Sequence, residues 1–254
     1  MSPIRTLSAI YPIRLRADLP RDVADAYWAG PHAELVKRGG HIAEYRQYHF
    51  SATDHGYWPA TPTVGTLPHE LFRWDGVTEI RLLNLAEMAR AAVGMLDTIF
   101  HDEQNVFDNV LGHLCGRGGA TRWSGSTTEP GHRTVLLLRR RRGTPFRQFK
   151  QYVHDRLAVA LQAAGALDVR AFTFLPITGI THRTPGLAHV YPPSHRHNGA
   201  VIFGLPQRDD VPGLLAAPPV AEVIAEQASV LTAVHAYSVD RTEDVIISDH
   251  EVTP

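Results

Sequence analysis

Residues 21–50 constrain the fold more than any other stretch, because a helical pattern, a double-glycine stop and a strand pattern follow one another directly. Apolar side chains recur at helical spacing over residues 21–38. The pair Gly39-Gly40 supplies the backbone freedom that ends a helix. Pro31 lies inside this helix and removes one backbone donor, so we expect a kink there. Residues 42–50 then alternate in character, which predicts a strand.

Alternation along this strand places Tyr45, Gln47 and His49 on one face. A strand face made of a phenol, an amide and an imidazole is unusual for a packed core. We therefore expect it to line a polar cavity, where the three groups would hold a polarised carbonyl and stabilise an enolate. A solvated face at the rim of the sheet is the alternative interpretation.

Bulk properties exclude several classes of protein. The chain has 254 residues and a formal net charge of −1, so no electrostatic argument favours nucleic acid as a partner. The single cysteine, Cys115, excludes an internal disulfide and a cysteine-rich metal site. The basic run at 139–142 predicts the exposed end of a strand, with a phosphate- or carboxylate-binding role as the alternative. No segment reads as a signal peptide or a membrane span, so we expect a soluble cytoplasmic protein without a membrane partner.

The order strand–helix–strand–strand–helix–strand occurs twice, with an offset of about 125 residues between the halves. The predicted strands are 8–16, 42–50, 75–83, 120–127, 133–142, 168–176, 198–205 and 232–240. The predicted helices are 21–38, 85–97, 102–114, 145–164 and 219–231. Each half resembles a split βαβ, ferredoxin-like unit, which covers one sheet face and leaves the other bare. We therefore predict an α+β fold made of two tandem ferredoxin-like repeats, residues 1–130 and 131–254. The repeats would bury their bare sheet faces against each other and form an intramolecular α+β barrel around a cavity.

Four segments resemble the EthD-like family of the dimeric α+β barrel superfamily. They are YWAGPHAELV at 27–36, IAEYRQYHF at 42–50, DGVTEIRLL at 75–83 and DEQNVFD at 102–108. The resemblance covers most of residues 8–127 and is weaker in the second half. The second half has Ala171, Thr173 and Leu175 in place of the Tyr-x-Gln-x-His strand. It also has His154 at about the position where the first half has Trp28. It implies a barrel fold and cofactor-free chemistry, as in dehydratases, decarboxylases and cyclases for aromatic or polyketide-like compounds of natural product biosynthesis. The wider superfamily also includes cofactor-free monooxygenases and haem-binding enzymes.

His32 is the first catalytic candidate, because it follows Trp28 by four residues on one helix face and occupies the position that the resemblance marks. A histidine near neutral pKa takes a proton from an acidic carbon or phenol, or gives one to a leaving hydroxyl. His49 is the second catalytic candidate, and a buried Glu79 on the third strand would fix the tautomer of its imidazole. The alternative is that Glu79 is exposed beside Arg81. For Asp102 and Glu103 we favour a structural role at a helix N-terminus.

Aromatic and histidine side chains of the loops and the last strand supply the predicted substrate-binding set. Together with Trp28 it comprises Tyr57, Trp58, Tyr191, His197, His235 and Tyr237. The loop histidines are His55, His69, His182, His189, His195 and His197, but no recognisable metal-ligand spacing occurs, so we predict no metal. A haem would need a proximal histidine, for which His154 or His235 would serve. We predict no cofactor.

The leading hypothesis is a cofactor-independent lyase or cyclase, acting on an aromatic or polyketide-like molecule by histidine acid–base catalysis. His32 or His49 would be the acid or base, with Tyr45 and Gln47 holding the oxyanion. An oxygenase, cofactor-free or haem-bound, is the first alternative, and a non-catalytic carrier of small molecules is the second. The expected assembly is a monomer, as a pseudo-dimer of repeats, or a homodimer of such chains. The sequence does not specify the substrate.

Overall fold

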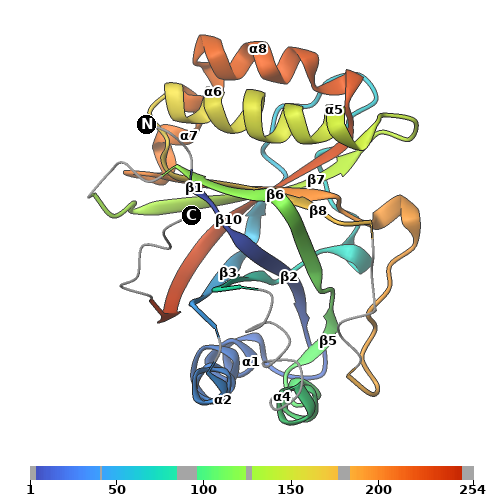
Figure 1. Ribbon diagram of the computed structural model, residues 1–254, viewed down its shortest axis with the longest axis vertical. Helices are drawn as coiled ribbons and strands as arrows, with labels where there is room; N and C mark the ends of the chain where they lie inside the picture. Colours follow the sequence, from blue (N-terminus) through green and yellow to red (C-terminus); the bar gives the residue numbers. More distant parts are fainter. Residues whose placement is uncertain (1–3, 41, 85–95, 124–127, 177–183, 248–254) are drawn as a thin grey trace.

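Eight strands close into an antiparallel barrel in the computed structural model, which describes residues 4–40, 42–84, 96–123, 128–176 and 184–247 (Figure 1). The eight are β2 (Leu7–Leu15), β3 (Glu44–His55), β4 (Gly76–Leu82), β6 (His113–Trp123), β7 (His132–Arg140), β8 (Leu167–Phe174), β9 (Gly199–Leu205) and β10 (Leu231–Ile246). Their order around the ring is β6-β8-β9-β7-β10-β3-β4-β2, and β2 pairs with β6 to close it. Two short strands, β1 (Ile4–Arg5) and β5 (Phe107–Val110), pair with β6 and β2.

The two halves of the chain pair their strands in the same order. Neighbours run β6-β2-β4-β3 in the first half and β10-β7-β9-β8 in the second. The halves meet at two seams, where β3 pairs with β10 and β6 pairs with β8. Each strand of the ring thus has a partner on both sides, and closure removes the unpaired edges that would invite aggregation. The predicted boundary at 130–131 falls between β6 and β7, and the division into domains stays a prediction.

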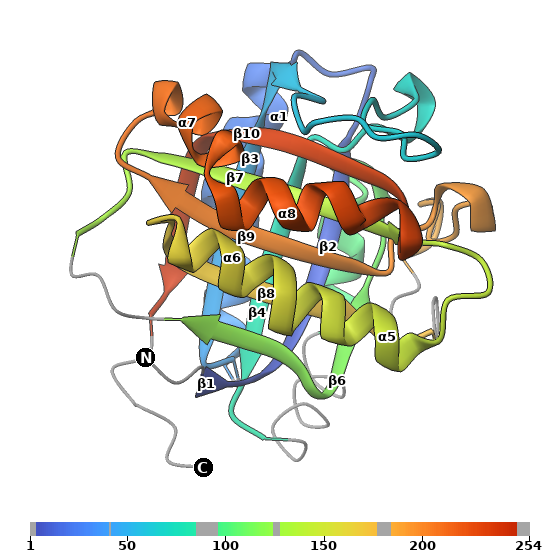
Figure 2. The same cartoon turned by 90° about the horizontal axis from the view of Figure 1, so that it is seen from above.

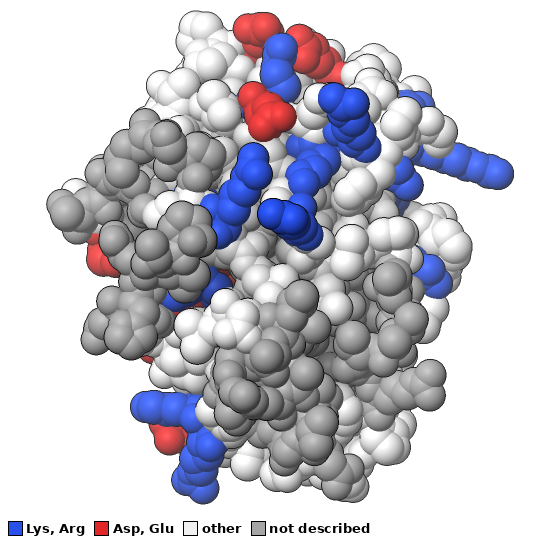
Figure 3. All heavy atoms as spheres, viewed as in Figure 1, with Lys and Arg blue, Asp and Glu red and all other residues white. Residues whose placement is uncertain are grey.

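Helices cover the outside of the barrel on two opposite sides (Figures 1 and 2). One group comprises α1 (Arg21–Tyr27), α2 (Ala33–Gly39) and α4 (Leu96–Glu103). The other comprises α5 (Phe146–Gln151), α6 (Ala158–Ala163), α7 (Val211–Ala216) and α8 (Pro218–Glu226). On the face shown in Figure 3, basic side chains gather over the upper part and acidic ones lie beside them at its edge. Within the described part of the chain, no helix is both long and apolar enough to cross a membrane.

The first helix of each half contains a π-helical turn. Trp28–His32 joins α1 to α2, and Tyr152–Leu157 joins α5 to α6. Pro31 lies inside the first of these turns, so the missing backbone donor is accommodated by a wider turn within a continuing helix instead of a break. Such turns concentrate at functional sites, and this one carries both Trp28 and His32.

The predicted helix at 102–114 is wrong, because α4 ends at Glu103 and the chain continues as β5 and β6. Strand 120–127 begins earlier than predicted, at His113, and residues 124–127 lie outside the described residues. The predicted helix 85–97 also falls almost entirely outside them. The remaining predicted helices and strands are present with shifted ends, and β3 runs on to His55.

The barrel interior is filled, mainly by aromatic and aliphatic side chains. They are Ile10, Tyr48, Phe50, Trp74, Val77, Leu111, Cys115, Ala120, Val135, Leu137, Phe172, Phe174, Tyr191, Ala200, Ile202 and Tyr237. A buried ion pair lies among them, in which Arg170 donates to Glu79 (2.8 Å) and to Asp168 (2.9 Å). Burial opposes the charge on Asp168, but Arg170 and neighbouring guanidinium groups lower its pKa to about 2.

Candidate functional site

The Tyr45, Gln47 and His49 face of β3 packs against the helices and not into the barrel. Gln47 Nε2 donates to the backbone oxygen of Trp28 (3.0 Å) and to the Tyr45 hydroxyl (3.0 Å). The ring of His49 lies 3.9 Å from the indole of Trp28, centroid to centroid. The prediction that the three residues share a face is therefore correct, whereas the expectation that they line the barrel interior is wrong.

Trp28 is the central side chain of this helix–sheet space, and it is completely buried. Gly76 makes room for it, because a Cβ at Gly76 would lie 2.4 Å from the indole Cη2 and 2.7 Å from the backbone oxygen of Tyr48. The indole Nε1 lies near the Tyr45 hydroxyl but makes no well-formed hydrogen bond among the described residues. A buried donor without such a bond is costly, so this atom remains available to an acceptor that enters the site.

His49 lies between two acceptors. Its Nδ1 is 3.0 Å from Asp25 Oδ1 and its Nε2 is 3.2 Å from Gln47 Oε1. Burial lowers the pKa of His49 below its ordinary value, and the bond to Asp25 only partly opposes this. Burial raises the pKa of Tyr45 to about 12, so its hydroxyl stays protonated at neutral pH. At neutral pH the imidazole of His49 and the phenol of Tyr45 are therefore uncharged.

His32, four residues after Trp28, forms a dyad with Asp102. Its Nδ1 lies 2.8 Å from Asp102 Oδ2, and the Tyr27 hydroxyl donates to Asp102 Oδ1 (2.5 Å). Burial would raise the pKa of Asp102, but the hydrogen bonds from His32 and Tyr27 outweigh it and lower that pKa. Among the described residues His32 Nε2 has no hydrogen-bond partner. With Nδ1 donating to the carboxylate, Nε2 carries the free lone pair of a general base.

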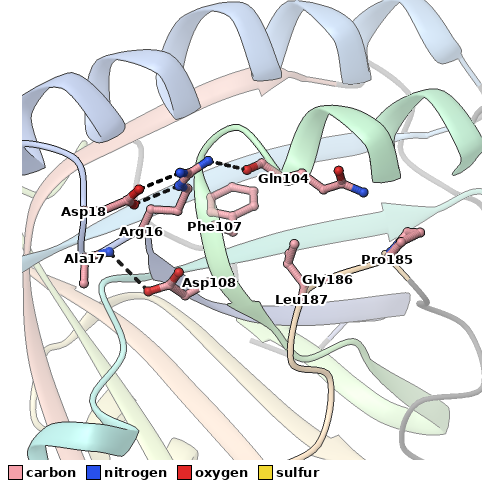
Figure 4. Close-up of a pocket in the computed structure, with 9 residues that line it drawn as sticks. All are labelled: Arg16, Ala17, Asp18, Gln104, Phe107, Asp108, Pro185, Gly186 and Leu187. Carbon is pink, nitrogen blue, oxygen red and sulfur yellow. Dashed lines mark hydrogen bonds and ion pairs between the residues drawn. The ribbon is translucent and has the colours of Figure 1, made fainter.

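A surface cavity of about 440 Å³ lies beside Phe107, and Figure 4 shows the residues that line it. It is lined by Arg16, Ala17, Asp18, Gln104, Phe107, Asp108, Pro185, Gly186 and Leu187. Phe107 connects the cavity to the dyad. It lines the cavity, and its ring meets the rings of His32 and Trp28 edge-on at centroid distances of 5.3 Å and 6.0 Å. Arg16 is held at the cavity wall by Asp18 (2.6 Å) and the backbone oxygen of Gln104 (2.9 Å). The ring of Phe107 thus separates the cavity from the imidazole of His32.

The other predicted site residues lie in two different places. Glu79 points into the barrel, where it accepts from Arg170 and Tyr48, so its predicted position beside His49 is wrong. Tyr57 and Trp58 pack into the second helix–sheet core, bonded to Thr134 and Gln227. The remaining four, Tyr191, His197, His235 and Tyr237, are buried at one end of the barrel interior. The predicted set therefore does not form one site.

Sequence reasoning missed Asp25 and Phe107 and assigned Asp102 to the wrong role. Asp102 lies in the last turn of α4 and not at a helix N-terminus. For Asp25 a signal existed, because Asp25, Trp28 and His32 follow each other at intervals of three and four, which places them on one helix face. Asp102 is 70 residues from His32, and no local pattern connects the two.

Neither histidine proposed as a haem ligand is suited to that role. Both ring nitrogens of His154 face threonine hydroxyls, Nδ1 that of Thr121 and Nε2 that of Thr173 (3.2 Å). His235 is 5% exposed, and its Nδ1 is bonded to His197 Nε2 at 3.0 Å, so it has no free ring nitrogen at that position. In the described part of the chain, no three or more His, Cys, Asp or Glu side chains are grouped to hold a metal ion. His182 lies outside that part.

No family model and no curated protein matches the sequence. Solved structures share its fold. A protein assigned as a monooxygenase from Lactobacillus acidophilus matches with a TM-score of 0.55 and 9% identity over 97% of this chain and 98% of its own. One so assigned from Fusobacterium nucleatum matches with a TM-score of 0.56 and 8% identity over 95% and 94%. An anthrone oxidase-like protein matches with a TM-score of 0.54 and 9% identity over 98% and 100%.

These similarities show a shared barrel fold, and they do not show the EthD-like family. The similar structures carry the names of oxidative enzymes. They overturn the prediction of a lyase or cyclase.

Proposed function

We propose that the protein is an oxygenase that uses no cofactor and acts on a flat, electron-rich ring with an acidic C–H or phenolic O–H group. The His32–Asp102 dyad carries the proposal, because it pairs a buried imidazole with a partly buried carboxylate, and His32 Nε2 has no partner among the described residues. The fold shared with proteins named as monooxygenases and as anthrone oxidase-like supports the reaction class. Membership of the EthD-like family stays a prediction, as do the tandem-repeat origin of the halves, the oligomeric state and the cellular location.

Deprotonation is the step that the dyad would perform. His32 Nε2 takes a proton from the substrate, and the resulting imidazolium is stabilised by the Asp102 carboxylate. The substrate becomes an enolate or phenolate, which is electron-rich enough to pass one electron to O₂. Trp28 Nε1, a buried donor without a well-formed hydrogen bond in the described part of the chain, would hydrogen-bond the developing oxyanion.

For a ring CH₂ group, one oxygen atom of O₂ enters the substrate and the other leaves as water. The substrate radical and superoxide combine into a C–O–O⁻ group, which takes the proton from His32 and becomes a hydroperoxide. Removal of the second C–H proton by His32 Nε2 expels hydroxide and leaves a carbonyl. The imidazolium then protonates the hydroxide, so CH₂ and O₂ give C=O and H₂O, and the imidazole is regenerated.

The remaining side chains of the helix–sheet space would position this chemistry. Tyr45 and Gln47 satisfy each other and hold the backbone of Trp28, so we assign them a positioning role. His49 lies against the indole at a tilt and is anchored by Asp25, so it holds the indole in place. The substrate would enter from the cavity, and a rotation of the Phe107 ring would bring it to His32.

Oxygen uptake with an anthrone-type or hydroquinone substrate tests the proposal. General base catalysis contributes about 10²–10⁴ in rate, so His32→Gln should lower kcat/KM at least about a hundredfold. His154→Gln is the matched control, because His154 lies in the π-helical turn of the second half with both nitrogens bound by threonines. It should retain near wild-type turnover. Equal turnover by folded His32→Gln and wild-type protein would contradict the proposal.

A further inference from the structure

One end of the barrel interior holds a cluster of side chains that the proposed reaction does not use. It consists of Arg139 at the end of β7, His235 and Tyr237 on β10, and His195 and His197 from the segment before β9. We call it the Arg139 cluster. His197 Nε2 and His235 Nδ1 are hydrogen-bonded at 3.0 Å, and both side chains are buried.

Arg139 differs from its neighbours in the basic run. Arg140 donates to the backbone oxygen of Thr144 (2.9 Å), and Arg141 donates to that of Ala228 (2.7 Å). Arg139 Nε is buried without a hydrogen-bond partner, and among the described residues no carboxylate pairs with this guanidinium. Burial lowers the pKa of Arg139, although the guanidinium remains charged at any physiological pH.

The surroundings of Arg139 are neutral and rich in donors. Burial, reinforced by the charge of Arg139, lowers the pKa of His235 to about 3 and that of His197 well below its usual range. Both imidazoles are therefore uncharged at neutral pH. Two more buried donors in the same interior, His113 Nδ1 and Trp74 Nε1, also have no partner among the described residues.

Aromatic rings flank this end of the barrel. Phe72 stacks on His195 with centroids 3.8 Å apart, and Trp74 stacks on Tyr191 at 4.7 Å. His195 and Arg139 are partly exposed, so solvent reaches the cluster from this end. A positive charge surrounded by neutral donors and flat rings is arranged like a receptor for a planar anion.

We propose that the Arg139 cluster binds a carboxylate, held by the guanidinium of Arg139 and by the neighbouring imidazoles. A partly buried cation without a counter-charge is unfavourable, and a carboxylate supplies both the charge and the two acceptors that fit a guanidinium. This binding site lies at the end of the barrel where Arg139 and His195 are partly exposed, apart from the helix–sheet space of the His32–Asp102 dyad. It does not depend on the proposed oxygenase activity.

Replacing chloride by acetate or benzoate at constant ionic strength tests the proposal on the intact protein. We expect a saturable rise in Tm, and saturable changes in the NMR signals of the His235 and His197 rings at neutral pH, because the bound carboxylate contacts these imidazoles. Benzoate should bind more tightly than acetate where the rings contact it, and binding of either supports the site.

Variants of the basic run separate this site from unspecific binding. Arg139→Gln should weaken carboxylate binding at least about tenfold, since a hydrogen-bonded charge pair is lost. Arg140→Gln is the matched control and should leave the affinity unchanged. Equal affinity in Arg139→Gln and wild type would overturn the proposal. If Arg139→Gln does not fold, the wild-type titration still decides, because the absence of any saturable change with both carboxylates also overturns it.

Discussion

Asp102→Asn should disable the dyad while retaining its shape. The carboxylate accepts from His32 Nδ1 at 2.8 Å and from the Tyr27 hydroxyl at 2.5 Å, and an amide provides only one acceptor oxygen. With the amide nitrogen facing Nδ1, His32 would favour the tautomer with the proton on Nε2, the atom that must accept the substrate proton. We expect kcat/KM to fall about 10²–10³-fold, within the range of general base catalysis.

The same substitution should lower the free energy of unfolding by about 2 kcal/mol at neutral pH, the size of one hydrogen bond to a charged group. For a chain of this length that corresponds to a fall in Tm of about 4–8 °C. The folded-state pKa of Asp102 is lowered, so its contribution is present above the unfolded pKa near 4 and is lost as the pH falls through the folded value. The difference in unfolding free energy between variant and wild type should therefore shrink in acid. Wild-type kcat/KM in the folded variant would refute the assigned role of the carboxylate.

Three further predictions concern the packing around the site and the barrel. Gly76→Ala places a Cβ 2.4 Å from the buried indole and should cost about 1–3 kcal/mol in urea unfolding, whereas Gly30→Ala, with open space around it, should not destabilise the helix. The pKa of His154 is lowered to about 4. Acidification from pH 6.5 to pH 4 should therefore lower the free energy of unfolding by up to about 3 kcal/mol through this residue. Wild type should lose more stability over that pH range than His154→Gln. Arg170→Met leaves the buried Glu79 without its counter-charge and should lower the free energy of unfolding by about 3–5 kcal/mol, measured by chemical denaturation at pH 7. Adding Glu79→Gln to this variant should restore part of the lost stability.

Local patterns predicted most of the helices and strands, because helix stops and strand alternation depend on neighbouring residues. The helix over residues 21–38 and the strand after it are present, with a π-helical turn where Pro31 predicted a kink. The failure at 102–114 has a physical cause. Residues 107–110 pair with β2, far away in the sequence, and that pairing outweighs local helical spacing.

The candidate site shows what alternation along a strand leaves undecided. A period of two residues fixes which side chains share a face, but it does not say which face the helices will cover. Tyr45, Gln47 and His49 were therefore grouped correctly and assigned to the wrong side of the sheet. The partner of His32 was beyond local reasoning as well, because Asp102 reaches it only through the packing of α4 against the π-helical turn.

Proton abstraction without oxygen tests the central claim most directly. Under anaerobic conditions in deuterated water, the acidic hydrogens of an anthrone-type substrate should exchange for deuterium at a rate that depends on the His32–Asp102 dyad. We predict rapid exchange with wild type and with His154→Gln, and exchange at least about a hundredfold slower with His32→Gln. Exchange by folded His32→Gln at the wild-type rate, or oxygen uptake by wild type without any anaerobic exchange, would contradict the account.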